Sequence, residues 1–287
     1  MKILAVGDFH GRFPRKISQI VKKEEIDVVV SVGDYPSFTL KKEFFKYAFR
    51  DNKPLWNFIG KKKCKEATLK DHASAEKVIR KLDELPVPVV SVLGNHDHPW
   101  PNDIIDIRKP KGKDFWKWNW DRKGYLTKFI RKFQNIKLLN YSVCKVNDFV
   151  FIGGRGHSMP GRVKSKAFRS HKKKLDNLFK KYKRQNKEGR VIFVYHNSPY
   201  NTKLDKITAK DAHDLVKNEH YGSKISRRII DQKQPILSLS GHIDEGRGKQ
   251  NLGKTLAVNI GSVHEGWCSI INLKEGKKPK VRFVKLK

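Results

Sequence analysis

Cysteine is scarce in this sequence: the 287 residues include only Cys64, Cys144 and Cys268, which are widely spaced and form no CxxC pair. Three isolated cysteines suggest neither a disulfide framework nor a thiolate metal cluster. Such usage fits a reducing compartment, so we expect a cytoplasmic protein.

Long apolar runs are also missing. The opening stretch Ile3–Val6 is too short for the apolar region of a secretion signal. No run approaches the roughly 20 apolar residues that a membrane span needs. We therefore expect a soluble protein without a membrane partner.

Acidic residues are few: 29 Asp and Glu stand against 63 Lys and Arg, which gives a formal net charge of +34. Such a charge favours a polyanionic partner, and nucleic acid is one candidate. A lysine-rich surface can equally reflect a hot or saline host or the bias of a lineage, because charge enrichment also accompanies thermostability. Composition alone leaves both explanations open.

Short apolar, β-branched runs recur along the chain and predict strands that are buried on both faces. They are Ile3–Val6, Val28–Val32, Val89–Leu93, Phe149–Ile152, Val191–Tyr195, Ile236–Leu239 and Leu256–Ile260. Helical patterns lie between several of them, such as Ile17, Ile20 and Val21, or Val78, Ile79 and Leu82. This alternation predicts a layered α/β fold, and the length allows a single domain over residues 1–287.

Three further segments complete this outline. Trp267–Leu273 and Val281–Leu286 predict a hairpin, so the second half should add antiparallel strands. Residues 35–71 and 100–125 match neither a strand nor an obvious core helix. We expect both to be insertions after strand ends, where the functional loops of α/β proteins lie.

Polar side chains of the metal-ligand type follow five of the predicted strands. They are Asp8 and His10, Asp34, Asn95 with His96 and Asp97, His196, and His242 with Asp244. Because the carboxyl ends of strands lie side by side in an open α/β sheet, these groups can converge on one site. Each group alone is weak evidence, since a polar residue after a strand is often only a turn or a helix cap. Five such groups, each after a predicted strand and in sequence order, are stronger evidence than any one of them.

The chemistry of these groups indicates the metal. Carboxylate, imidazole and amide ligands without thiolate suit Mn, Fe, Zn or Ni better than a calcium site or a zinc finger. Six or more such groups are enough for two ions that share a bridging carboxylate.

The motifs Asp8-x-His10, Gly33-Asp34, Gly94-Asn95-His96-Asp97, His196 and Gly241-His242-x-Asp244 resemble the five ordered motifs of the calcineurin-like metallophosphoesterases. The resemblance covers essentially the whole chain. The segments around Tyr195–Asp205, Gly241–Gly248 and Asn259–Gly266 are similar to stand-alone, mostly archaeal phosphoesterases of that superfamily. The resemblance implies a four-layer fold of two mixed β-sheets flanked by helices, but it does not imply a particular substrate.

The resemblance also implies a role for each residue. Asp8 and His10 would bind a first metal, Asp34 would bridge, and Asn95, His196 and His242 would bind a second. His96 would be catalytic, stabilising developing charge and helping to protonate the leaving oxygen, and Asp97 would hold its ring. Two divalent ions would generate a bridging hydroxide that attacks a phosphodiester or a phosphomonoester.

One residue departs from the family pattern, which normally ends in Gly-His-x-His, because this chain has Asp244 at the last position. A carboxylate can still ligate the first metal, and it would favour Mn or Mg over Zn. It could instead leave that metal weakly held. The alternative function is therefore a nucleic-acid-binding protein that retains the fold with weak or no catalysis.

Two other motifs carry less weight. Residues 248–255 match the P-loop expression G-x-x-x-x-G-K-[ST], but a strand follows where a P-loop needs a helix, so we interpret them as a turn between strands. His157 follows another strand end, and we interpret it as a surface or supporting histidine.

Basic segments give the last expectation. Residues 162–190 carry 13 Lys or Arg, while Leu175, Leu178, Phe179 and Tyr182 recur at helical spacing, which predicts an amphipathic helix with a basic outer face. Residues 108–123 interleave basic residues with Phe115, Trp116, Trp118 and Trp120. These rings either stack on bases of single-stranded nucleic acid or pack the insertion onto the body or a second copy. The sequence leaves the oligomeric state open.

Overall fold

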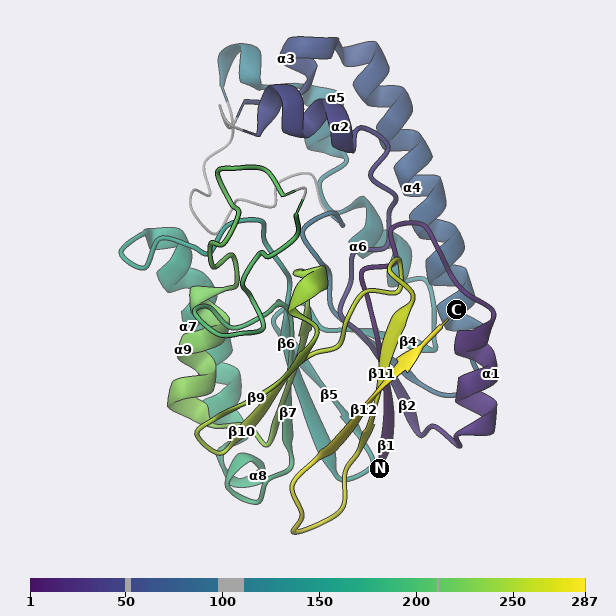
Figure 1. Cartoon of the computed structure of the whole chain (residues 1–287), viewed down its shortest axis with the longest axis vertical. Helices are drawn as coiled ribbons and strands as arrows, with labels where there is room; N and C mark the ends of the chain where they lie inside the picture. Colours follow the sequence, from purple (N-terminus) through teal and green to yellow (C-terminus); the bar gives the residue numbers. More distant parts are fainter. Residues whose placement is uncertain (50–52, 98–110, 211, 287) are drawn as a thin grey trace.

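The computed structural model describes residues 1–49, 53–97, 111–210 and 212–286. Two mixed six-stranded sheets in this part of the chain face each other, and helices cover the outer side of each (Figure 1). The first sheet has the order β12 (Lys280–Lys285), β11 (Trp267–Asn272), β1 (Lys2–Val6), β2 (Val28–Ser31), β3 (Val89–Ser91) and β4 (Ile136–Leu138). The second has the order β5 (Ser142–Val146), β6 (Phe149–Gly154), β7 (Val191–Asn197), β8 (Leu237–Gly241), β10 (Thr255–Asn259) and β9 (Gly248–Leu252).

The helices fall into groups on either side of the sheets and around the top of Figure 1. They are α1 (Lys16–Lys23), α2 (Lys41–Glu43), the π-helix η1 (Phe44–Ala48), α3 (Trp56–Ile59), α4 (Lys61–Asp83), η2 (Gly112–Asp114), α5 (Lys117–Asp121), α6 (Tyr125–Ile130), α7 (Lys166–Lys181), α8 (Lys183–Lys187), α9 (Lys224–Lys233) and η3 (Asp244–Gly246). Helices α1, α4 and α6 cover the first sheet, while α7 and α9 cover the second.

Alternate side chains of each central strand enter different cores. In β1, Leu4 and Val6 pack against the helices of the first sheet, whereas Ile3 and Ala5 pack between the two sheets. The period of two along a strand is what separates the two sets. Complete burial of one large apolar side chain stabilises the fold by about 1.5–3 kcal/mol, so strands that are apolar on both faces favour this four-layer arrangement. The predicted fold class is confirmed.

The strand directions bring the polar strand ends to one end of both sheets. β1, β2 and β3 pair in parallel, and so do β6, β7 and β8 with β10. These strand ends meet across two sheets, because β1, β2 and β3 belong to the first sheet while β7 and β8 belong to the second. The site therefore lies where the two layers meet.

Most predicted elements are present with shifts of one or two residues at their ends. The C-terminal hairpin is confirmed, since β11 pairs antiparallel with β12, and β11 also joins the first sheet antiparallel to β1. The basic amphipathic segment forms α7 and α8, and Ser165 caps α7 by accepting the Phe168 N–H. Residues 248–255 include β9, Gly253 in the left-handed region and the start of β10, so they form a hairpin rather than a P-loop.

The first predicted insertion contains more helix than the sequence indicated. The helix expected around Val78 begins at Lys61, within the stretch 35–71, because Cys64 and Ala67 pack into a small apolar cluster with Trp56 and Trp116. Residues 100–110 of the second predicted insertion lie outside the described residues. Within the described ranges, no helix combines the length and the apolar character that a membrane span requires.

Candidate metal centre

The carboxyl ends of β1, β2, β3, β7 and β8 bring predicted ligands together, most from the loops that follow the strands and His196 from within β7 itself. Asp8 and Asp34 are 2% exposed and His196 is completely buried. Two groups of ligand atoms result, each with all its atoms within 4.8 Å of one another: Asp8, His10 and Asp34 in the first, and Asp34, His196 and His242 in the second. Asp34 belongs to both, which is the arrangement that a bridging carboxylate needs.

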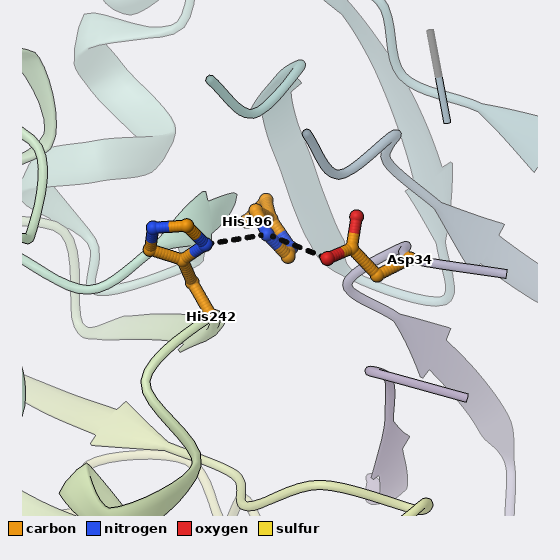
Figure 2. Close-up of side chains that lie close together, drawn as sticks. All are labelled: Asp34, His196 and His242. Atoms are coloured by element: carbon orange, nitrogen blue, oxygen red, sulfur yellow. Dashed lines mark hydrogen bonds and ion pairs between the residues drawn. The ribbon is translucent and has the colours of Figure 1, made fainter. Parts of the chain in front are cut away.

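The second group converges from both sheets (Figure 2). His196 Nε2 lies 3.1 Å from His242 Nδ1 and 3.5 Å from Asp34 Oδ2. The side-chain oxygen of Asn95 lies 2.9 Å from each of the two histidine nitrogens. Asn95 therefore joins this group as a fourth donor.

The hydrogen bonds around this group leave lone pairs facing one another. His196 Nδ1 lies 2.8 Å from the Val32 carbonyl oxygen, so in a neutral ring Nδ1 carries the proton and Nε2 carries a lone pair. The amide nitrogen of Asn95 donates to Ser158 Oγ at 3.2 Å, which turns its oxygen toward His196 and His242. A divalent cation satisfies such facing lone pairs, whereas protons alone satisfy them poorly. These residues fit a metal.

The first group has an unpartnered donor of the same kind. Nδ1 of His10 is buried and finds no hydrogen-bond partner among the described residues. Burial lowers the pKa of His10 to about 4, and burial also lowers the pKa values of His196 and His242. All three rings are therefore neutral at pH 7, the form in which imidazole binds metals.

The backbone of the ligand loops is strained. Asp8, His10, Asp34 and His242 have φ angles of 50°, 44°, 57° and 75°. Non-glycine residues rarely adopt this left-handed region, and such strain gathers at functional sites where the surroundings enforce it. Here the Asp34 carbonyl oxygen accepts the N–H of His10 at 3.1 Å, and the Gly33 carbonyl oxygen accepts that of Asp8 at 2.9 Å.

The carboxylates of Asp8 and Asp34 lie in opposite electrostatic surroundings. Burial and the nearby charges of Asp34 and Asp244 raise the pKa of Asp8 well above its usual value. Burial would also raise the pKa of Asp34, but His196, His96 and His10 outweigh it and hold that pKa below its usual range. Asp34 is therefore the anionic centre around which the histidines gather.

Residues 1–245 match the sequence family of the calcineurin-like phosphoesterases. The chain belongs to the calcineurin-like phosphoesterase family. One solved structure has 19% sequence identity to it and a TM-score of 0.67, covering 100% of this chain and 99% of its own. A crystal structure from Thermus thermophilus has 14% identity and a TM-score of 0.55, with coverage of 100% and 99%. Both share the fold. No curated protein matches the sequence.

Membership in the calcineurin-like phosphoesterases makes this chain one of a metal-dependent family of phosphoester hydrolases. His96, the expected catalytic residue, lies next to both ligand groups. Its backbone N–H donates to Asp34 Oδ1 at 2.8 Å, and its half-buried ring meets the His10 ring edge-on at 5.5 Å and the Phe38 ring at 4.6 Å.

Asp97 has partners other than the predicted one. Its Oδ2 accepts the N–H groups of Asp34 at 2.8 Å and Gly94 at 2.6 Å, and its Oδ1 accepts that of Tyr35 at 2.8 Å. No hydrogen bond to the His96 ring occurs among the described residues. Its three backbone donors instead link the loops after β2 and β3, and a hold of Asp97 on the His96 ring stays a prediction.

Asp244, at the start of η3, is not a member of either ligand group among the described residues. Burial, then Glu265 and Glu245, raise its pKa to about 6. Its ligation of the first metal stays a prediction.

Three residues near the site were not predicted from the sequence to lie there. Ser158 orients Asn95, while Ser262 and His264 follow β10 and bond to the backbone of Asp8. The position of Ser262 and His264 could have been inferred from the sequence, because both follow β10, which was among the predicted strands. β10 runs parallel to β8. Its carboxyl end therefore points to the same edge. His157, by contrast, is a buried supporting residue whose Nε2 lies 3.0 Å from Ser223 Oγ.

Gly94 gives a test of the tight packing around Asp34. A Cβ at this position would collide with the Asp34 carboxylate, so Gly94→Ala should displace that side chain and lower kcat/KM roughly 10²-fold. Gly248→Ala is the matched control, because a Cβ there meets only an ordinary contact with Leu204 at 3.5 Å. Steady-state kinetics of both variants measure the effect, and equal activity in the two would contradict it.

Proposed function

We propose that this calcineurin-like phosphoesterase hydrolyses a phosphodiester with the help of two divalent ions. Asp8, His10 and Asp34 would hold one ion, and Asp34, Asn95, His196 and His242 would hold the other. The observation that carries the proposal is the sharing of Asp34 by two separate groups of ligand atoms.

The chain's own residues would divide the remaining work. Bound divalent ions lower the pKa of water to give a nucleophile near neutral pH, and they neutralise phosphoryl oxygens. His96 stands beside both groups and would donate a proton to the leaving oxygen, a role that suits a half-buried imidazole. Asp34 would keep the two ions together, since its Oδ1 is already fixed by the His96 N–H.

The donor set favours Mn, with Fe, Zn, Ni and Mg as alternatives. Imidazole nitrogens occur in both groups together with carboxylate oxygens, and thiolate is missing from them. Imidazole disfavours Ca and Mg as first choices, and the lack of thiolate disfavours a structural zinc site. The cytoplasm remains the proposed location, and the three free cysteines support it.

The substrate is proposed to be a phosphodiester of a nucleotide or a nucleic acid, with a phosphomonoester as the alternative. The net charge of +34 supports a polyanion. The tryptophans support it less. Trp116 packs against Trp56 at 5.4 Å in the small apolar cluster, and Trp118 lies 4.9 Å from Trp116 with Arg122 over its ring. These contacts favour packing within the chain over base stacking.

The direct test uses metal-free protein and two chromogenic substrates, bis(4-nitrophenyl) phosphate and 4-nitrophenyl phosphate. Added Mn²⁺ should restore turnover, with the diester hydrolysed faster than the monoester. Chelation should abolish the activity again. Turnover that is the same with and without metal would overturn the proposal.

A second candidate, a nucleic-acid-binding protein with weak catalysis, is favoured by the position of Asp244 outside both ligand groups and by the net charge. It predicts that single-stranded oligonucleotides bind at low salt. Affinity should then fall roughly 10²- to 10⁴-fold between 50 and 200 mM salt if about 6–10 phosphates of the single strand are contacted. Fluorescence anisotropy measures this, and a lack of binding at 50 mM salt would exclude it.

A further inference from the structure

A surface cavity of about 390 Å³ lies at the end of η3, and its lining is cationic. The lining residues are Lys203, Leu204, Gly246, Arg247, Gly248 and Lys249, without a carboxylate among them. In the described part of the chain, no ion pair joins the three cations to an acid. The adjacent acid, Glu245, instead accepts the N–H groups of Thr208 and Ala209 at 2.9 and 3.0 Å. The cavity therefore presents three positive charges that no described carboxylate pairs with.

The cavity lies at the same edge of the second sheet as the metal centre. Gly248 begins β9 and pairs with Asn259, the last residue of β10, which runs parallel to β8. β8 ends at Gly241, directly before the candidate ligand His242. Because β10 lies between β8 and β9, and neighbouring strands are about 4.8 Å apart, Gly248 lies on the order of 10 Å from the carboxyl end of β8. One substrate molecule can reach both places.

Arg247 is held in place by an aromatic ring. Its guanidinium carbon lies 3.6 Å from the centroid of the Trp267 ring. Gly261 makes room for its stem, because a Cβ at that position would come within 2.8 Å of Arg247 Cδ. A cation–π contact uses the charge of the guanidinium and leaves its N–H donors available. These donors form a planar fork that matches the oxygens of a phosphate group.

The walls of the cavity are joined to one another by backbone contacts. A Cβ on Gly246 would lie 2.2 Å from the Leu204 carbonyl oxygen, so only glycine lets the two segments approach this closely. The same carbonyl oxygen accepts the side-chain amide of Asn259 at 3.1 Å, and the Lys203 N–H donates to Gln250 Oε1 at 3.1 Å. Walls that are already fixed reduce the entropy lost when a ligand binds.

We propose that this cavity binds a second phosphate group of the substrate, one that is not hydrolysed. The inference rests on the proposed phosphodiesterase function and deepens it, because it requires a substrate with at least two phosphate groups, such as an oligonucleotide. One phosphate would occupy the metal centre while the other reaches Lys203, Arg247 and Lys249. This contact is the same in the bound substrate and in the transition state, so it should lower KM and leave kcat unchanged.

Inhibition by dinucleotides tests the proposal, because an inhibition constant reports affinity whether or not the dinucleotide is cleaved. The probes are a thymidine dinucleotide with hydroxyl ends and the same molecule with a phosphate at its 5′ or its 3′ end. Each competes against bis(4-nitrophenyl) phosphate, which has a single phosphate, at constant ionic strength with Mn²⁺. For the wild type, one of the phosphorylated forms should have an inhibition constant about tenfold lower than the unphosphorylated form, the effect of one hydrogen bond to a charged group.

Three variants with the same change of charge locate the effect. Arg247→Gln should remove the preference for the phosphorylated form, and Lys249→Gln, which alters an exposed side chain, should weaken it. Both should hydrolyse bis(4-nitrophenyl) phosphate with the wild-type kcat. Lys254→Gln is the matched control, because this exposed lysine lies in the turn at the opposite end of β9, and it should keep the full preference.

The failure of this inference differs from the failure of the proposed function. A wild type without the preference, a preference that survives in both Arg247→Gln and Lys249→Gln, or one that is lost equally in Lys254→Gln would overturn the inference and leave the metal-dependent diesterase intact. A wild type that does not hydrolyse bis(4-nitrophenyl) phosphate with Mn²⁺ would instead overturn the proposed function, and this inference with it.

Discussion

Replacing Asp34 with alanine is expected to remove both metal ions and to lower kcat/KM about 10⁴-fold, which corresponds to about 5.4 kcal/mol of transition-state stabilisation. The reason is geometric: among the residues that the structure describes, Asp34 is the one that belongs to both groups of ligand atoms. Elemental analysis of the purified variant measures the ions, and diester hydrolysis measures the rate.

Stability supplies an independent readout for the same substitution. Mn²⁺ at 100 times its dissociation constant should stabilise the wild type by about 2.7 kcal/mol for each site, and it should leave the melting temperature of Asp34→Ala unchanged. Asp148→Ala, an exposed aspartate between β5 and β6, is the control and should behave as the wild type. Retention of two ions by Asp34→Ala would refute the bridging role.

His96→Ala is expected to lower kcat by about 10²- to 10⁴-fold while both ions remain bound. Its side chain is in neither ligand group, and its contact with Asp34 is made by the backbone, which alanine preserves. If the ring protonates the leaving oxygen, the loss should be larger for an alkyl leaving group than for 4-nitrophenolate, which needs no proton.

A series of diesters with leaving groups of increasing basicity measures this dependence. The wild type should show a shallow decline in rate, and His96→Ala a steep one. Parallel slopes for the two proteins would assign His96 to charge stabilisation or positioning instead. Loss of metal from His96→Ala would contradict its place outside the ligand groups.

Most of the strands were predictable because they are short, continuous apolar runs. A strand of this kind has apolar side chains on both faces, so both faces must be buried. β4, β5 and β9 were not predicted for the opposite reason. β4 has only three residues, β5 is half-buried at the edge of its sheet, and β9 reads Gly-Lys-Gln-Asn-Leu with little apolar character. The division of the strands between two sheets was predicted only from the family resemblance. The residue pattern shows that a strand has two apolar faces, but it does not show which other strand or helix each face packs against.

The candidate ligands were predictable from their place after strands, but the way they are held was not. Left-handed backbone at Asp8 and Asp34 follows from contacts between loops that are distant in sequence. The backbone hydrogen bonds of Asp97 likewise need the loops after β2 and β3 to be adjacent. The contacts of Ser262 and His264 with the Asp8 backbone were not predictable either, because they require the loops after β1 and β10 to be adjacent.

Crystals grown with Mn²⁺ and measured by anomalous diffraction test the central claim most directly. Two peaks should flank the Asp34 carboxylate, one near Asp8 and His10 and one near His196 and His242. A single peak, or manganese bound away from Asp34, would contradict a two-metal centre built on this residue.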